Sequence, residues 1–346
     1  MNIKKISKPI KISAIIVSIL FIIIIVKYAF LSNTNFDKNE VYIKIPHNTN
    51  YEQAKKIIAP YIDNYSDFET VASIWQYESN VKSGRFLFKK GMSTLGLVKA
   101  LRHNIVVKLS FNNQERLEDL VGKVSSQIEA DSLSLLQAIK DPVFLSQNGF
   151  NEENIFTMFL PNTYEMYWNT TANDFRDKML DAYKDFWNKE KTEQAKSHNL
   201  SPIEATILAS IVHKESVKNE DRPKIAAVYL NRIKIEMPLQ ADPTNIFGRK
   251  KKENNFKQVI KQVLEGDLKI DSPYNTYTNL GLPPGPIAMP DKSALEAVLN
   301  PDKNNYLYFC ASVENFGTTE FAETYEQHLE IAKKYREWVK KQAYKR

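Results

Sequence analysis

The longest apolar run of the chain, residues 12–31, lies near its N-terminus and is interrupted only by two serines, one lysine and one tyrosine. About 20 apolar residues span a bilayer as a helix, so this run predicts a transmembrane helix. Beyond it, the apolar positions recur either every second residue, as in strands, or every third or fourth, as in helices. We therefore expect an α+β protein with a single N-terminal transmembrane helix.

A small βααβ module is expected at residues 40–104, after a polar linker at 32–40. Val41–Ile45 alternates as a half-buried strand does, and a second strand opens at Gly84 with Phe86 and Phe88 on one face. Helical patterns cover residues 51–62, 67–78 and 92–102. Further along, the patterns predict a strand at 105–111, helices at 117–138 and 174–191, and an amphipathic helix at 321–341 that packs into the core.

The helix expected after Ser201 carries the first chemical signal. Ser201 and Glu204 form a capping box around a proline at the first helical position. Leu208, Ile211 and Glu215 follow along one stripe, so Glu215 continues an apolar face. An apolar environment raises the pKa of a carboxyl group, as a general acid requires. A solvated glutamate near a helix C-terminus fits the same spacing.

The net charge of +6 reflects the N-terminus. Five lysines and no acidic residue fall in residues 1–31, which leaves 42 basic and 41 acidic residues in the remainder. Four of these lysines precede the apolar run, so residues 1–11 are expected to be a cytoplasmic tail. A cleaved signal peptide is the alternative, but no small-x-small cleavage site follows the run. We expect a single-pass protein of the cell (inner) membrane with an extracytoplasmic catalytic domain, and no nucleic-acid partner.

Metal and cofactor signals are missing from the sequence. The single cysteine, Cys310, lies in an apolar stretch (306–311) that suggests a buried strand and a structural role. The five histidines have no metal-ligand spacing, and there is no glycine-rich phosphate loop. We expect neither a metal nor a cofactor. The basic run 249–252 is expected to be a solvated loop.

Five sequence blocks follow one another within about 80 residues. They are A-S-I-V-H-K-E (209–215), D-R-P-K-I-A-A-V-Y-L-N-R (221–232), M-P-L-Q-A-D-P-T (237–244), S-P-Y-N-T-Y (272–277) and G-L-P-P-G-P-I (281–287). Their order resembles the endolytic murein transglycosylases, the MltG or YceG-like family. The resemblance covers nearly the whole chain and is strongest from residue 201 to 301.

This resemblance implies cleavage of the β-1,4 bond between N-acetylmuramic acid and N-acetylglucosamine in nascent peptidoglycan. The muramic acid C6 hydroxyl attacks its own C1, which leaves a 1,6-anhydro end and terminates elongation of the glycan strand. The resemblance also implies a LysM-like module at 40–104, a catalytic domain at 105–346, and peptidoglycan synthases as partners. The module either binds N-acetylglucosamine polymers or only spaces the catalytic domain from the membrane.

Glu215 matches the family's catalytic glutamate. Amide side chains suit N-acetyl and hydroxyl groups, tyrosines can stack on pyranose faces, and Arg232 can pair with a carboxylate or cap its helix. The proline-rich segment 281–286 suits a rigid rim, and F-L-P-N-T-Y-E (159–165) is either a further groove-lining block or a turn. The substrate-binding residues expected on this basis are Asn231, Arg232, Gln240, Asp242, Thr244, Tyr274, Asn275 and Tyr277.

His213 departs from the family, which commonly has glutamate there. It lies about 200° around the helix from Glu215, so it should point away from the bond that breaks. Two other functions stay open. A muramidase would need a second carboxylate, for which Asp221, Asp242 and Asp271 are the candidates, and a non-catalytic scaffold would bind glycan without cleaving it. Glycan-length preference, oligomeric state and pH optimum do not follow from the sequence.

Overall fold

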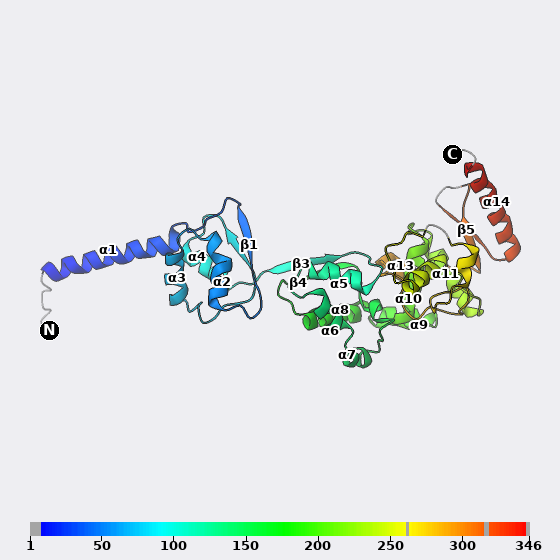
Figure 1. Cartoon of the computed structure of the whole chain (residues 1–346), viewed down its shortest axis with the longest axis horizontal. Coiled ribbons are helices and arrows are strands. Elements are labelled where there is room, and N and C mark those ends of the chain that lie inside the picture. Colours follow the sequence, from blue (N-terminus) through cyan, green and yellow to red (C-terminus); the bar gives the residue numbers. More distant parts are fainter. Residues whose placement is uncertain (1–7, 261–262, 315–317, 344–346) are drawn as a thin grey trace. The chain divides into compact units, whose positions relative to one another are not determined.

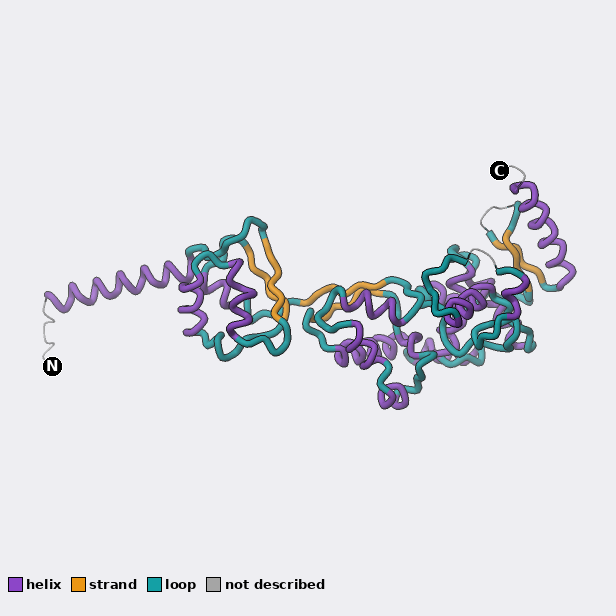
Figure 2. The backbone as a smooth tube through the Cα atoms, viewed as in Figure 1, coloured by secondary structure: helices purple, strands orange, loops and turns teal. Residues whose placement is uncertain are grey.

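The computed structural model describes residues 8–260, 263–314 and 318–343. It is a mixed α+β structure, as expected, with helices predominating and strands only in pairs (Figures 1 and 2). The chain divides into two compact units. An N-terminal unit holds residues 1–109, 126–130 and 164–171, and a C-terminal unit holds residues 110–125, 131–163 and 172–346.

The N-terminal unit begins with helix α1 (Lys8–Phe30). Residues Ile12–Phe30 are long and apolar enough to cross a membrane, and none of them is buried against the protein. This confirms the apolar helix and is compatible with either a membrane anchor or a signal sequence. Of the predicted cytoplasmic tail, residues 1–7 lie outside the described residues.

The expected strand–helix–helix–strand order is confirmed. Strand β1 (Glu40–Ile45) pairs antiparallel with β2 (Gly84–Lys89), with Val41 opposite Phe88. Ile43, Ile45, Phe86 and Phe88 face the core because alternate residues of a strand share one face. Around them lie α2 (Tyr51–Ile58), η1 (Ala59–Tyr61), α3 (Tyr65–Ile74) and α4 (Thr94–Ala100). The likeness to a LysM module stays a prediction.

The predicted polar linker at 32–40 is instead docked on this module. Asn33 is 4% exposed, and its amide nitrogen donates to the Asn64 carbonyl at 2.9 Å and to the Thr94 hydroxyl at 3.1 Å. A buried amide is stable only when it is hydrogen-bonded, and both partners come from elements distant in sequence. Polar composition alone therefore misidentified this segment as a linker.

Strand β3 (Val106–Phe111) pairs with β4 (Asn162–Tyr167). The helix predicted at 117–138 is two helices, because Asp131 accepts a hydrogen bond from the Ser134 amide and so starts a new one. Asn188 likewise starts a second helix inside the predicted 174–191. The elements here are α5 (Leu117–Ser125), α6 (Ser132–Ile139), α7 (Pro142–Gln147), η2 (Ile155–Met158), α8 (Ala172–Phe186) and α9 (Lys189–Ser197).

Helix α10 (Pro202–Glu215) is the centre of the C-terminal unit. Every residue from Ala205 to Val212 is buried, and the predicted capping box of Ser201 and Glu204 is present. Ile287 donates its amide to the Ser210 hydroxyl at 3.1 Å, which holds the proline-rich segment against the helix. The other elements are α11 (Arg222–Lys234), α12 (Asp242–Lys252), η3 (Glu265–Lys269), α13 (Lys292–Leu299), β5 (Tyr308–Ala311), β6 (Thr319–Ala322) and α14 (Tyr325–Ala343).

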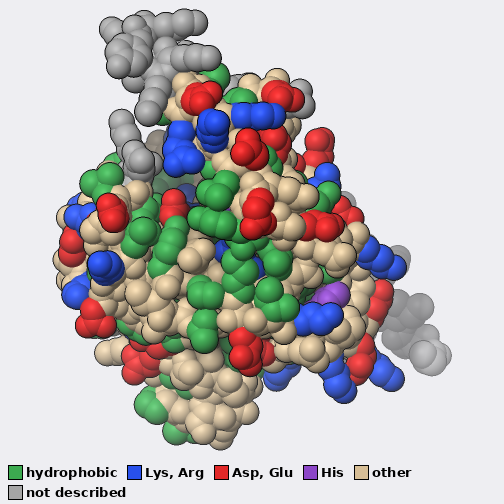
Figure 3. All heavy atoms as spheres, turned by 90° about the vertical axis from the view of Figure 1, so that its right-hand side faces the viewer, with side chains coloured by type: hydrophobic (Ala, Val, Ile, Leu, Met, Phe, Trp, Pro, Cys, Tyr) green, Lys and Arg blue, Asp and Glu red, His purple; other side chains and the backbone are tan. Residues whose placement is uncertain are grey.

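Three expectations for the C-terminal unit are wrong. Helix α14 forms, but it begins at Tyr325 because residues 321–322 belong to β6. It does not enter the core: Tyr325 is 54% exposed and Leu329 41%. Figure 3 shows hydrophobic side chains at the surface of this end of the molecule, among charged ones. Cys310 is only half-buried, because β5 pairs with β6 alone. The basic run 249–252 is the last turn of α12 rather than a loop.

Candidate active site

Glu215 lies at the wall of a pocket of about 290 Å³ in the C-terminal unit, hereafter the Glu215 pocket. The last residue of α10 meets one face of α11, the start of α12, strand β5 and the start of α14 there. The pocket is lined by Glu215, Tyr229, Arg232, Leu239, Gln240, Asp242, Tyr277, Tyr308, Phe309, Tyr325 and His328.

The Glu215 carboxyl group is held in a largely protein-enclosed position. The Tyr229 hydroxyl, itself buried, donates a hydrogen bond of 2.8 Å to Oε1 of Glu215. Burial raises the pKa of Glu215 to about 7, against the opposing effect of the Tyr229 hydrogen bond, and the negative charge of Asp242 adds to the rise. Glu215 can therefore hold a proton near neutral pH and give it up readily.

Arg232 is the cationic side chain among those lining the pocket, since burial lowers the pKa of the other basic group, His328. Arg232 forms no ion pair with Glu215. Its Nε donates to the Leu307 carbonyl at 2.7 Å and its Nη1 to the Leu239 carbonyl at 2.6 Å. The side chain is 7% exposed, and burial lowers its pKa. Arg232 thus ties the segments before α12 and β5 to α11 rather than neutralising the carboxyl group.

Asp242 and Tyr277 also line the Glu215 pocket. The Tyr277 hydroxyl donates to Oδ1 of Asp242 at 2.5 Å. Of the three candidate second carboxylates, Asp242 alone lines the pocket: Asp221 accepts from the Thr319 hydroxyl, and Asp271 is exposed outside it.

Four of the expected substrate-binding residues lie outside this pocket. Thr244 and Asn275 are fully buried; the Thr244 hydroxyl donates to the Ala241 carbonyl at 2.7 Å, and Asn275 donates to the carbonyls of residues 268 and 270. Asn231 donates to the carbonyls of residues 304 and 306. Tyr274 is 2% exposed and cannot present its ring face to a sugar. Thr244, Asn275 and Asn231 thus donate to backbone carbonyls, and Tyr274 donates to the Glu153 carboxylate, which fixes the loops around the pocket.

The sequence reasoning missed the aromatic side of the pocket, formed by Tyr308, Tyr325 and His328 and hereafter called the aromatic wall. Tyr308 stacks on His328 with ring centroids 5.3 Å apart and lies 5.8 Å from the Tyr325 ring. The aromatic cluster Y-L-Y-F at 306–309 was a signal of its existence. Its position beside Glu215 depends on the docking of β5 and α14, which no local pattern reveals.

His213 is directed elsewhere, as its helical position predicted. Its Nδ1 lies 3.3 Å from Oδ2 of Asp291, and it does not line the Glu215 pocket. Burial lowers the pKa of His213, and the nearby Asp291 charge opposes that effect. The departure at this position therefore leaves the surroundings of Glu215 unaltered.

The proline-rich segment and the 159–165 block do not line the Glu215 pocket either. Gly285 packs so closely that an added Cβ would lie 2.0 Å from the Glu153 carbonyl oxygen, so the segment is a packed structural turn. Among the described residues, no group of three or more His, Cys, Asp or Glu side chains could hold a metal ion.

Comparison with known proteins gives the family. The profile of the YceG-like family matches residues 43–334. An endolytic murein transglycosylase of Bacillus subtilis is 29% identical over 275 residues, 74% of each chain, and one of Streptococcus pneumoniae is 29% identical over 322 residues, 84% of this chain but 57% of that protein. The 2.6 Å crystal structure of a yceG-like protein from Listeria monocytogenes is 26% identical, with a TM-score of 0.55 over 85% of this chain and 99% of that one. Since the matched profile spans most of the chain, the protein belongs to the YceG-like family.

Proposed function

We propose that this chain is a membrane-anchored lytic transglycosylase that cleaves the β-1,4 bond between N-acetylmuramic acid and N-acetylglucosamine in nascent peptidoglycan. The observation that carries the proposal is the carboxyl group of Glu215, with a pKa of about 7, in a pocket with an aromatic wall. The names of the curated relatives support the substrate.

In the proposed reaction Glu215 performs both proton transfers. It first protonates the glycosidic oxygen, so the bond from that oxygen to C1 of the muramic acid breaks. The C6 hydroxyl of the same sugar then bonds to C1 and returns its proton to Glu215, leaving a 1,6-anhydro end. No water is consumed, and the tethered hydroxyl has a high effective concentration.

The surrounding side chains suit this chemistry. The Tyr229 hydrogen bond engages one carboxyl oxygen of Glu215 and leaves the other for proton transfer. The Asp242 carboxylate can stabilise the positive charge that develops at C1 in the transition state. The aromatic wall offers ring faces on which sugars can stack, and Gln240 offers an amide for hydroxyl or N-acetyl groups.

A two-carboxylate muramidase is the second candidate, because Asp242 lines the same pocket as Glu215. In that reaction Asp242 would activate water or act as the nucleophile, and the product would have a reducing end. The hydrogen bond from the Tyr277 hydroxyl argues against Asp242 as a free base or nucleophile, since it already occupies Oδ1 of this carboxylate.

Mass spectrometry of the products decides between these functions. The full-length protein in detergent is incubated with uncross-linked peptidoglycan strands, beside Glu215→Gln. Anhydromuramyl ends from the wild type alone would support the transglycosylase. Reducing ends lost in Asp242→Asn would establish the muramidase, and binding of strands without cleavage would establish a scaffold.

The cellular role belongs to the same proposal. The apolar α1 would anchor the chain with its N-terminus in the cytoplasm, so that the Glu215 pocket acts on newly made strands outside the membrane and terminates their elongation. The βααβ module would bind glycan, and peptidoglycan synthases would be neighbours. Co-purification of a synthase with the tagged full-length protein, and not with the tagged α1 segment, tests that last point.

A further inference from the structure

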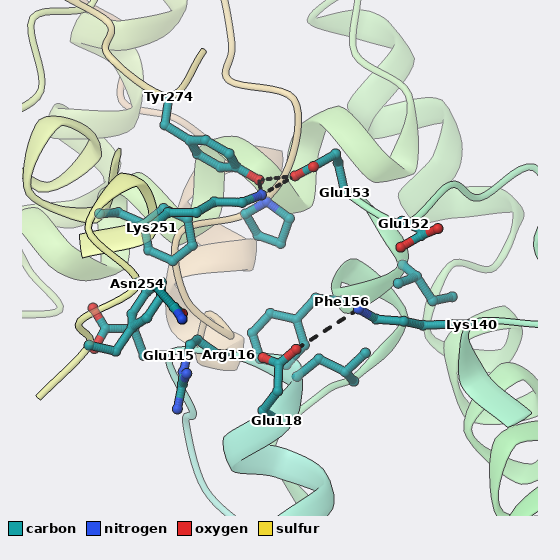
Figure 4. A pocket seen from close by; sticks show the side chains of 15 residues that line it. Glu115, Arg116, Glu118, Lys140, Glu152, Glu153, Phe156, Lys251, Asn254 and Tyr274 are labelled. Carbon is teal, nitrogen blue, oxygen red and sulfur yellow. Dashed lines mark hydrogen bonds and ion pairs between the residues drawn. The ribbon is translucent and has the colours of Figure 1, made fainter. Parts of the chain in front are cut away.

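A second cavity, of about 400 Å³, lies in the C-terminal unit apart from the Glu215 pocket and shares no lining residue with it. Its volume falls in the usual range for ligand sites. Side chains of both charge signs surround it, and we call it the mixed-charge cavity (Figure 4). The cations are Arg116, Lys140 and Lys251, and the carboxylates are Glu115, Glu118, Glu152 and Glu153.

Most of these charges are paired, and the cavity has an apolar floor. Arg116 pairs with Asp119 and Glu115 with Lys250, neither of which lines the cavity. In Figure 4, Lys251, Glu153 and Tyr274 meet at one side, where Glu153 accepts a hydrogen bond of 2.8 Å from the Tyr274 hydroxyl as well as the Lys251 ammonium. At another side, Lys140 and Glu118 are 3.9 Å apart, too far for a strong hydrogen bond. The floor is apolar, with Ile155, Phe156, Phe247 and Phe256 among its residues.

Two polar groups of this cavity have no protein partner among the described residues: the exposed Glu152 carboxylate and the side-chain amide of Asn254. A polyanion would meet four carboxylates, and a polycation three cations. A neutral glycan can hydrogen-bond to these groups but carries no charge to pair with either sign. A ligand that carries ammonium and carboxylate groups on a short chain can pair with both and cover the floor.

The mixed-charge cavity is connected to the Glu215 pocket through α12. Asp242, the first residue of this helix, lines the Glu215 pocket, and Lys251 lines the cavity nine residues later. At 1.5 Å per residue, about 14 Å separates them along the helix axis. A smaller hollow, of about 200 Å³, is lined by Lys214 and Pro243, the neighbours of Glu215 and Asp242, and by Phe247, which also lines the cavity.

We propose that the mixed-charge cavity binds the peptide stem of a peptidoglycan strand whose glycan backbone lies at Glu215. The stem is a short peptide with free carboxylates and an amine, attached to the sugar that carries the reacting C1. This inference rests on the proposed function, and it adds a reason for the enzyme to select peptide-bearing strands over bare glycan.

The test compares peptide-bearing, uncross-linked strands with the same strands after an amidase has removed the stems. Initial rates for the full-length protein in detergent give kcat and KM for each. We expect the wild type to have a KM about tenfold lower for peptide-bearing strands, as one charge-assisted hydrogen bond to the stem would provide. Lys140→Gln should bring the ratio of the two KM values close to one.

Lys191→Gln is the matched control. Lys191 also lies 3.9 Å from a glutamate, Glu296, but lines neither the cavity nor the Glu215 pocket. It should keep the wild-type ratio. Equal KM values for the two substrates in the wild type, or the same loss in both variants, would overturn the proposal.

A binding experiment separates this inference from the proposed function. A synthetic stem pentapeptide with a free side-chain amine is titrated into Glu215→Gln protein by calorimetry, with and without Lys140→Gln. Binding that Lys140→Gln weakens about tenfold supports the cavity even if no strand is ever cleaved. No binding to Glu215→Gln protein overturns the cavity assignment, even if strand cleavage is confirmed.

Discussion

Two glutamates of the C-terminal unit each accept a hydrogen bond from a tyrosine, yet their pKa values are shifted in opposite directions. Glu215 and Glu153 each accept a hydrogen bond of 2.8 Å from a tyrosine hydroxyl, that of Tyr229 and Tyr274 respectively. Burial raises the pKa of Glu215 to about 7. Burial also acts to raise the pKa of Glu153, but the Lys251 ammonium and the Tyr274 hydroxyl together outweigh it, so that pKa is lowered.

The difference comes from burial and from the nearest cation: the Glu153 side chain is 46% exposed, whereas the Glu215 carboxyl group is enclosed by the protein. Lys251 reaches Glu153 directly, whereas Arg232, the arginine beside Glu215, bonds to backbone carbonyls. A hydrogen bond from a neutral hydroxyl does not offset the loss of hydration of a buried carboxylate. A hydroxyl together with an ammonium group does offset it at Glu153. One site is therefore suited to proton transfer and the other to recognition of charge. The four predictions below test this contrast, from the largest expected effect to the smallest.

Glu215→Gln should lower the rate of strand cleavage about 10³-fold, since a positioned general acid contributes on that order. Glu153→Gln, the same change in the paired carboxylate, should lower it less than about tenfold. Initial rates on uncross-linked strands at pH 6.5 measure both. An equal loss of cleavage rate in the two variants would mean that the pKa difference between Glu215 and Glu153 does not affect catalysis.

The difference in unfolding free energy between Glu215→Gln and the wild type should depend on pH. The pKa of Glu215 is about 7 in the folded chain and near 4.3 when unfolded. The folded chain therefore holds this proton more tightly, and the associated stability is present below pH 4 and lost as pH rises through 7. Glutamine carries no charge. The free energy of unfolding of the variant should therefore exceed that of the wild type by up to about 3 kcal/mol at pH 8 and equal it near pH 4.

Thermal unfolding of the full-length protein at both pH values measures this difference. A Tm gain of the same size at both would show that the substitution acts through packing and not through the charge. Glu153→Gln is the control, and it should lose stability at pH 8 because Lys251 loses its partner.

A cation placed at the Glu215 pocket should make Glu215 resemble Glu153. Gln240 lines the pocket and is exposed, so lysine can replace it without burying its charge. We expect Gln240→Lys to lower the pKa of Glu215 and reduce kcat/KM at pH 7.5 about tenfold, with the pH profile shifted to lower pH. Gln240→Met, similar in size and uncharged, should keep the wild-type pH profile; a shifted profile in both would exclude the electrostatic explanation.

The smallest effect should distinguish the two tyrosines. Tyr229→Phe removes the only side-chain hydrogen bond found for Glu215 and should cost about 1 kcal/mol of unfolding free energy. Tyr274→Phe should cost about half of that, because Lys251 still holds Glu153. Denaturant unfolding at pH 7 compares them. A larger cost for Tyr274→Phe would contradict the assigned role of Lys251.

Local signals in the sequence were sufficient for the most strongly patterned elements and for the position of Glu215, but not for the breaks inside the helices predicted at 117–138 and 174–191. The capping box of Ser201 and Glu204 and the proline after Ser201 set the start of α10, and the apolar stripe placed Glu215 at its end. The βααβ order, the apolar α1 and the direction of His213 followed in the same way, because helix and strand periodicity are properties of neighbouring residues.

The membership of the pocket could not be predicted locally. Thr244 and Asn275 belong to the blocks that carry the family resemblance, yet both are buried. The Thr244 hydroxyl bonds to that of Thr276, and the Asn275 side chain accepts from that of Asn245. Tyr308 and His328 belong to no recognised block, yet they stand beside Glu215. A motif indicates which residues are typical of the family. It does not indicate whether a given residue contacts the substrate or only holds a substrate-binding loop in place.

What the sequence by itself determined is the βααβ order, the apolar α1, the resemblance to the family and the position of Glu215 at the end of α10. Only the tertiary structure decided which carboxylate stays without a cation, where the aromatic wall stands, and that a mixed-charge cavity lies along α12. The physical reason is that a pKa or a binding site depends on groups brought together through space, and the chain places Lys251 and Glu153 98 residues apart before folding joins them.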